Sequence, residues 1–193
     1  MQSDDDLIQS IKQGRQHYFE ILINRYKTPI LNFIYKMIYD YDEAQNLSQE
    51  VFITVYKTLA RYRMEGNFQA YIFTIAKNLT LNYIKKSQRM VNLSSLLNKN
   101  AADRYFHHQD TQFSHLEKES KEQQLVIALK ELKENHRIAL ILKAYLGFTY
   151  KRISEITGWS IPKIETLISR AKSQLKNKIF LQENSDQNVK KVR

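Results

Sequence analysis

The chain has 193 residues and a formal net charge of +10, which leaves room for one domain or two small ones. It contains no cysteine, and this excludes disulfides, thiol catalysis and thiolate metal ligands. The positive charge favours a polyanionic partner, either nucleic acid or an anionic membrane surface. With only four glycines and two prolines, the composition predicts an almost entirely helical protein.

The first ten residues are acidic and polar, which is unlike a signal peptide. No apolar run approaches the length of a membrane span. We therefore expect a cytoplasmic protein that is not inserted in a membrane.

The N-terminal quarter shows helical spacing of its apolar residues. Ser3 or Asp4 can cap a first helix, and Gly14 interrupts it. Pro29 is expected to open the next helix, whose apolar stripe continues to Tyr41.

A further helix is expected to begin at Asp42, with one side fully apolar. Its other side carries a polar and acidic strip, made of Glu43, Asn46, Gln49 and Glu50. From spacing alone, this strip is either a solvated face or a docking surface for a partner protein.

Residues 61–68 break the helical pattern and mix arginines, aromatic residues, a methionine and a glycine. A loop of this composition can stack an unpaired base and hold a single strand, or its aromatic rings can fill the core. The helix expected from Tyr71 to Arg89 ends in a run of cations. These cations can bind phosphates, but they also complement the helix dipole.

Residues 90–119 lose the apolar period and predict a flexible linker. His107, His108 and His115 lie there without metal-ligand spacing, so we expect no metal site. Helical spacing resumes at Leu125 and continues to Tyr145, and residues 182–193 are expected to form a polar tail.

The most informative stretch is 149–179. A short helix from Tyr150 to Thr157 precedes Gly158, which supplies the backbone freedom for a sharp turn. Ser160 is a suitable N-cap for a second helix, and Pro162 falls in its first turn. That helix is apolar on one side and basic on the other, which is typical of a helix-turn-helix with its recognition helix. An ordinary helical hairpin is the alternative.

Three motifs, in this order along the chain, resemble the bacterial RNA polymerase sigma factors of the extracytoplasmic-function (ECF) type. Residues 43–52 are similar to the family's acidic-Ala-acidic-Asp-Leu-x-Gln-Glu-x-Phe signature, with Asn46 in place of the Asp. Residues 66–78 are similar to its Gly-x-Phe-x-x-Trp-Leu-x-x-Ile-Ala-x-Asn pattern, with Tyr71 in place of the Trp. Residues 160–171 are similar to its recognition helix, from which Pro162, Glu165 and Leu167 depart.

The resemblance implies an all-α fold of two small helical domains joined by a flexible linker. Residues 1–90 would be the region 2 domain, which binds the polymerase core and recognises and melts the −10 element. Residues 91–120 would be the linker, and residues 121–181 the region 4 domain, whose helix-turn-helix recognises the −35 element. Residues 182–193 would be the tail.

The resemblance also implies three sets of contact residues. The family grips the clamp helices of the largest polymerase subunit with the strip that here is Glu43, Asn46, Gln49 and Glu50. The −10 contacts would be Arg61, Tyr62, Met64, Asn67, Phe68, Lys77, Asn78, Lys85 and Lys86. The −35 contacts would be Lys163, Glu165, Thr166, Ser169, Arg170, Lys172 and Lys176.

The expected partners are therefore core polymerase, promoter DNA and an anti-sigma factor. We expect no catalytic residue, cofactor or metal, because melting DNA needs cations and aromatic rings but no acid, base or nucleophile. Two other functions stay open: a stand-alone helix-turn-helix regulator that binds no polymerase, and a nucleic-acid-processing enzyme with an appended helix-turn-helix. The unpatterned linker further predicts that the free protein does not fix its two domains relative to each other.

Overall fold

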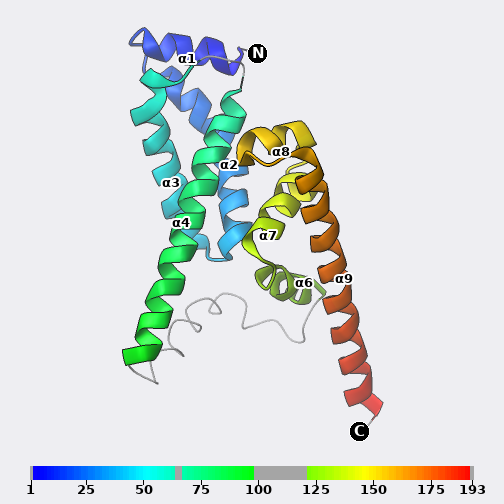
Figure 1. Ribbon diagram of the computed structural model, residues 1–193. Helices are drawn as coiled ribbons and strands as arrows, with labels where there is room; N and C mark the ends of the chain where they lie inside the picture. The colour runs from blue at the N-terminus through cyan, green and yellow to red at the C-terminus, as the bar shows by residue number, and fades with distance from the viewer. Residues whose placement is uncertain (1, 64–66, 98–120, 192–193) are drawn as a thin grey trace.

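The computed structural model describes residues 2–63, 67–97 and 121–191, and all the elements within these ranges are helices (Figure 1). The N-terminal half contains α1 (Asp4–Lys12), α2 (Tyr18–Ile38), α3 (Tyr41–Thr58), the 3₁₀ turn η1 (Leu59–Arg61) and α4 (Phe68–Leu97). The C-terminal half contains α6 (Lys121–Lys130), α7 (Glu134–Leu140), the π-helical turn η2 (Ile141–Tyr145), α8 (Tyr150–Thr157) and α9 (Ile161–Lys191). The predicted all-α fold is confirmed for the described residues.

In the N-terminal half, α2, α3 and α4 lie side by side, and α1 lies across one end of them (Figure 1). The side chain of Ser3 caps α1 and forms a reciprocal capping box with Asp6, as the N-terminal pattern predicts. Asp4 then ties α1 to α2, because its carboxylate pairs with Arg25 and accepts a hydrogen bond from the Tyr26 hydroxyl at 2.5 Å.

Pro29 does not open a new helix, contrary to the prediction. It lies inside α2, which runs without a break from Tyr18 to Ile38. A proline here removes one backbone hydrogen bond. The helix continues because residues on both sides of it, including Tyr26, Ile30 and Phe33, are buried in the core and hold both turns in place.

The C-terminal ends of two helices also differ from the prediction. The helix α4 extends to Leu97, into the segment expected to be linker, and α9 extends to Lys191, through the segment expected to be a polar tail. The rest of the predicted linker, including its three histidines, lies outside the described residues. Within the described part of the chain, no helix is long and apolar enough to cross a membrane.

In the C-terminal half, α6, α7 and α8 pack along α9. A small apolar cluster of Leu132, Leu140 and Ala171 fixes α7 against α9, and Lys178 of α9 pairs with Glu131 beside α6. The structure therefore places α8 and α9 as the two arms of a helical hairpin on a helical support.

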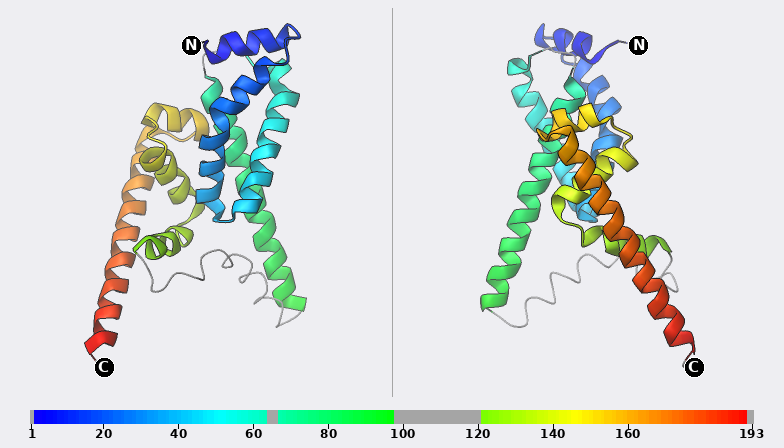
Figure 2. Two further views of the ribbon diagram at one scale, coloured as in Figure 1. Left: turned by 180° about the vertical axis from the view of Figure 1, so that it is seen from behind. Right: turned by 45° about the vertical axis from the view of Figure 1, so that its right-hand side comes forward.

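The two halves pack directly against each other through α2 and α4 on one side and α7, η2 and α8 on the other. The views in Figures 1 and 2 agree that α3 lies on the far side of the N-terminal half from this contact. One hydrophobic core continues from Leu7 to Ile168, and it includes residues of both halves. The expectation that the two domains are not fixed relative to each other thus differs from the structure, because packed side chains rather than the linker hold them together.

Candidate protein and nucleic-acid interfaces

The polar strip of α3 is exposed. Asp40 caps this helix by accepting a hydrogen bond from the Glu43 amide at 3.0 Å, so α3 begins one residue before the predicted Asp42. Leu47, Val51 and Val55 are buried against α2 and α4. The opposite face therefore points to solvent: Asn46, Gln49 and Glu50 are exposed, and Glu43 is half-buried. The predicted strip is brought together on one helix face, open to a partner.

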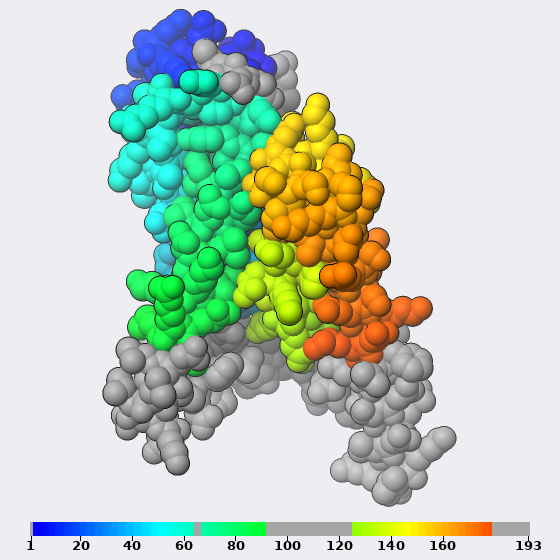
Figure 3. All heavy atoms as spheres, viewed as in Figure 1, coloured from blue at the N-terminus to red at the C-terminus, as the bar shows by residue number. Residues whose placement is uncertain are grey.

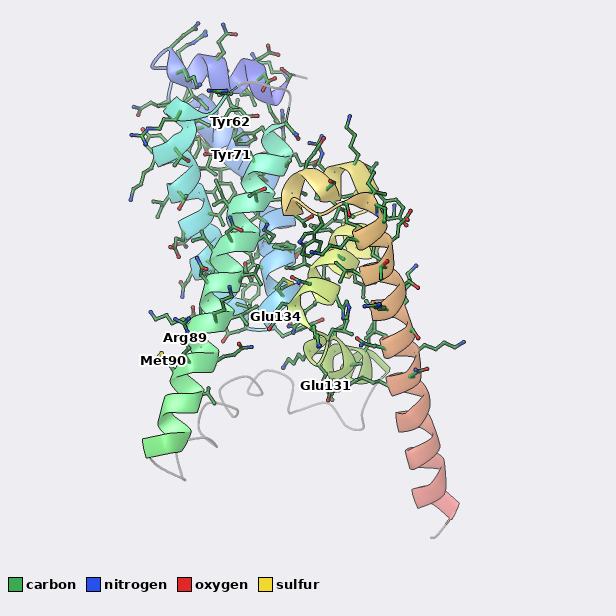
Figure 4. The ribbon with its side chains drawn as sticks, in the orientation of Figure 1. Tyr62, Tyr71, Arg89, Met90, Glu131 and Glu134 are labelled. Atoms are coloured by element: carbon green, nitrogen blue, oxygen red, sulfur yellow. The ribbon has the colours of Figure 1, made fainter. Side chains whose placement is uncertain are left out.

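Tyr62, directly after η1, packs against two aromatic rings of α4. The side chain of Tyr62 is half-buried (Figure 4). The centre of its ring lies 5.6 Å from that of Phe68 and 4.8 Å from that of Tyr71. Phe68 is only 2% exposed and also contacts the ring of Tyr26, so it belongs to the core. In this conformation Phe68 has no free ring face for a base, unlike the role that the resemblance gives it.

The other predicted residues of this segment are placed differently. Arg61 is exposed, and Asn67 is half-buried. The side-chain oxygen of Asn67 is buried without a hydrogen-bond partner in the described part of the chain. Met64 lies outside the described residues. Sequence reasoning missed one contact here: Lys12 of α1 donates a hydrogen bond to the Tyr62 carbonyl at 2.6 Å, and no periodicity relates residues so far apart.

The remaining predicted −10 contacts lie on α4, in two different environments. Asn78, Lys85 and Lys86 are exposed. Lys77 is half-buried, and its ammonium donates to the carbonyl of Ile156 in α8 at 3.1 Å. Burial lowers the pKa of Lys77 from its ordinary value. The structure therefore separates Lys77 from the other members of this set.

The helix-turn-helix forms as predicted, with α8 spanning the expected residues. Thr149 caps α8, and Gly158 adopts the left-handed conformation with φ of 73°. The Ser154 hydroxyl donates to the Trp159 carbonyl at 2.6 Å and closes the turn. The Trp159 amide also donates to the Thr157 hydroxyl at 3.2 Å. Because backbone geometry and these two side-chain bonds fix the turn, it holds α9 at a defined angle to α8.

All the predicted −35 contacts lie on the exposed side of α9. They are Lys163, Glu165, Thr166, Ser169, Arg170, Lys172 and Lys176. Ile164, Ile168 and Ala171 are buried on the opposite side. The Lys163 ammonium lies 5.3 Å from the centre of the Trp159 ring, and this contact holds the first basic side chain of the recognition helix near the turn.

No group of three or more potential metal ligands exists among the residues that the structure describes. The described surfaces are instead an exposed polar and acidic face on α3 and exposed basic side chains on α4 and α9.

Two family models match the chain over most of these elements. The model described as Sigma-70 region 2 matches residues 22–90, from α2 to α4. The model described as Sigma-70, region 4 matches residues 122–175, from α6 into α9. Together they cover well over half of the chain. The chain belongs to the sigma-70 family. Only α1, among the helices that precede the linker, lies wholly outside the matched ranges.

Individual relatives agree with this assignment. The RNA polymerase sigma factor YlaC of Bacillus subtilis (strain 168) is 27% identical over 157 residues, which are 81% of this chain and 89% of YlaC. The ECF RNA polymerase sigma-E factor of Haemophilus influenzae is 25% identical over 92% of this chain and 95% of its own. The sigma factor RpoE of Bartonella quintana, solved in complex with the anti-sigma factor NepR, has the same fold, with a TM-score of 0.63 and 22% identity over 83% of this chain and 96% of RpoE. The protein is an ECF-type sigma factor, which directs promoter-specific initiation of transcription by RNA polymerase.

Proposed function

We propose that this sigma factor divides its work between the two halves, with residues 1–90 binding core polymerase and the −10 element and residues 121–181 binding the −35 element. The observation that carries this proposal is the separation of two exposed surfaces. An acidic and polar face lies on α3, and a basic face lies on α9, each within a different matched region. Catalysis belongs to the polymerase, and the protein acts where promoter DNA is, in the cytoplasmic nucleoid.

The first contact is with the clamp helices of the largest polymerase subunit. Asn46, Gln49 and Glu50 are exposed on a helix whose opposite face is buried, so substitutions there leave the core intact. We expect Gln49→Ala with Glu50→Lys to keep the fold and to abolish binding to core polymerase. Gln16→Ala with Glu20→Lys makes the same charge change on exposed residues near the start of α2 and is the matched control. Equal retention of both variants by immobilised core would contradict this assignment.

The second contact is with the −10 element. Tyr62 and Asn67 would hold an extruded base, while Lys77, Lys85 and Lys86 would bind the phosphates of the same strand. Arg61, Met64 and Asn78 would be further contacts of the −10 element. Phe68 would act from beneath, because its ring supports Tyr62. Base–aromatic stacking contributes about 1–3 kcal/mol per base.

Tyr62 provides the test of this second contact. Tyr62→Ala should reduce the permanganate-reactive open complex and leave binding to −35 duplex unchanged. Tyr62→Phe keeps the ring and should restore opening. Normal opening by Tyr62→Ala would mean that another side chain holds the base.

The third contact is with the −35 element. Lys163, Glu165, Thr166 and Ser169 lie in the first turns of α9, where a recognition helix meets base edges. Arg170, Lys172 and Lys176 follow along the helix and would bind phosphates. An anti-sigma factor is a further expected partner, since the similar RpoE was solved with one.

The whole function is tested by transcription from a library of genomic fragments with core polymerase, with and without this protein. We expect discrete new start sites only when the protein is present. Binding of the protein to those fragments without any association with core polymerase would instead indicate a stand-alone regulator.

A further inference from the structure

Trp159 lies in the turn between α8 and α9, and side chains of α8 bind both of its backbone polar groups. Its carbonyl accepts from the Ser154 hydroxyl at 2.6 Å, and its amide donates to the Thr157 hydroxyl at 3.2 Å. Its side chain is half-buried and packs against the hydrophobic core. The place of the indole ring is therefore set by α8 and the core, and not by α9 alone.

The ammonium of Lys163 lies over this ring, 5.3 Å from its centre. Lys163 is exposed and forms no ion pair with any residue that the structure describes. The nearby Arg152 is held differently, because it pairs with Glu155 at 2.9 Å. A carboxylate neutralises the cation that it holds and repels DNA, whereas the face of an indole attracts a cation and leaves its charge intact.

The predicted −35 contacts differ in how firmly their side chains are held. Lys163 has the indole ring, and the Thr166 hydroxyl donates to the Pro162 carbonyl at 2.9 Å. These two residues are three apart, so they are neighbours on one face of the first turns of α9. In the space-filling view these turns form part of the visible surface beside α8 (Figure 3). A lysine without such a partner loses more side-chain freedom on binding and reaches several phosphates and bases equally well.

We infer that Trp159 is a specificity-determining positioning residue of the −35 interface, because its ring holds the Lys163 ammonium at the guanine acceptors of one base pair. Lys163 is assigned to base edges by the proposed function, on which this inference rests. Guanine presents O6 and N7 as acceptors in the major groove, and lysine can donate to both. An ammonium has three N–H groups, so those that do not face the ring stay available for the base. Trp159 acts through Lys163, without a base contact of its own.

This role differs from a structural role of the same ring in what its loss would change. Without the ring Lys163 keeps its charge, so binding to phosphates and the salt dependence of affinity stay the same. The choice of base is then relaxed at one position only. Loss of a ring that merely stabilised the turn would weaken binding to all −35 sequences alike.

The test uses core polymerase with the full-length protein and a promoter library in which only the −35 element is randomised. Trp159→Leu removes the ring, Trp159→Phe keeps an aromatic face, and Lys163→Met removes the cation. Tyr150→Leu is the matched control, because the Lys143 ammonium lies 4.8 Å from the centre of the Tyr150 ring in the same helix-turn-helix, and neither residue is an assigned DNA contact. Circular dichroism checks that each variant keeps its helices.

We expect Trp159→Leu to lower the preference for guanine at one base pair about two- to five-fold, with the other positions and the salt slope unchanged. Lys163→Met should abolish the preference at the same base pair. In the double variant, loss of the ring should add nothing to loss of the cation. Trp159→Phe should keep most of the preference, and Tyr150→Leu should keep all of it.

A second measurement on the free full-length protein needs no DNA. The ring current of an indole shields protons above its face, so the ε-protons of Lys163 should resonate upfield of those of the other lysines. In protein with ¹³C-labelled lysine, Lys163→Met identifies this signal by removing it. Trp159→Leu should return the signal to the ordinary lysine position, and Tyr150→Leu should leave it in place.

The possible failures are distinct. If Lys163→Met relaxes one base pair and Trp159→Leu changes nothing, the proposed function stands and Trp159 is not a positioning residue. Equal weakening of all sequences by Trp159→Leu would make the ring a structural part of the turn, and effects that add in the double variant would mean that the ring itself contacts DNA. A Lys163 signal at the ordinary position in the parent would remove the contact on which the inference depends.

Failure of the proposed function has its own result. If the parent holoenzyme shows no base preference in the −35 element, or if Lys163→Met changes none, then Lys163 reads no base. That result would reject its assignment in the proposed function, and the inference with it, even with an upfield Lys163 signal in the free protein.

Discussion

Arg137 offers the sharpest test of the forces that hold the C-terminal half. Its Nη1 donates to the carbonyl of Met37 in α2 at 2.6 Å, and its Nη2 donates to the carbonyls of Lys130 at 2.9 Å and Leu132 at 3.0 Å. Burial lowers the pKa of Arg137 from its ordinary value, although the guanidinium remains charged at neutral pH. A charged group is therefore dehydrated and held by backbone carbonyls.

The size of the effect follows from two opposing terms. Hydrogen bonds to a charged group contribute about 1.5–3 kcal/mol each, so three bonds amount to about 4.5 kcal/mol or more. Replacing the arginine by methionine keeps the apolar stem but recovers part of the dehydration cost of the cation, which is several kcal/mol. We expect Arg137→Met to lower the free energy of unfolding by about 2 kcal/mol. Arg137→Lys, which keeps a charge but loses the fork of donors, should lower it by about half as much.

Urea unfolding can be followed by the fluorescence of Trp159, the only tryptophan, which lies half-buried in the turn between α8 and α9. Arg170→Met on the exposed side of α9 is the control, and it should stay within about 0.5 kcal/mol of the parent. A parent-like midpoint for Arg137→Met would refute the reasoning, because it would mean that the dehydration of the guanidinium cancels all three bonds.

Three further predictions concern the turn, one buried phenol and the recognition helix. Gly158→Ala should lower the free energy of unfolding by about 1 kcal/mol in the same urea assay, because a φ of +73° strains a residue with a Cβ. The loss should be no larger, because the added Cβ would meet no atom within 4 Å, and a much larger loss would indicate a steric clash. Burial raises the pKa of Tyr39 to about 12, so its contribution to stability is complete below pH 10 and is lost as pH rises toward 12. In the Tyr39→Phe protein, the free energy of unfolding should fall by about 1 kcal/mol less between pH 10 and pH 12 than in the parent, a figure that allows for solvent screening. The same fall in both proteins would contradict this prediction. Glu165→Ala should change which sequences are preferred in a randomised −35 library, whereas Lys172→Ala should weaken all sequences alike and lower the salt slope by about one. An equal gain in affinity for every sequence in Glu165→Ala would mean that this carboxylate reads no base.

The sequence predicts those parts of the structure that depend on local rules. The cap at Ser3, the left-handed Gly158 and the limits of α8 all follow from the chemistry of neighbouring residues, and all are confirmed. The exposed sets on α3 and α9 follow from helical spacing in the same way. The prediction that Pro29 begins a helix was wrong, because packing of the residues around it in the core outweighs the tendency of proline to interrupt a helix.

The contact between the halves could not be predicted for a different reason. Lys77 and Arg137 bind backbone carbonyls, and every residue has the same carbonyl, so no pattern of side chains marks Met37 or Ile156 as acceptors. The burial of Phe68 was likewise hidden, because an aromatic residue in a loop motif fits a base or a core equally well.

The long separation along the chain between Lys77 and its acceptor, the Ile156 carbonyl, sets a time interval during synthesis. Lys77 precedes Ile156 by 79 residues, whereas α1 to α4 also pack against one another. At about 5–20 residues per second, Leu97, the last residue of α4, is added roughly 3–12 s before Ile156. A nascent chain on the ribosome can therefore form the N-terminal half while Lys77 still lacks its acceptor in α8, and the contact between the halves forms only after α8 has been made.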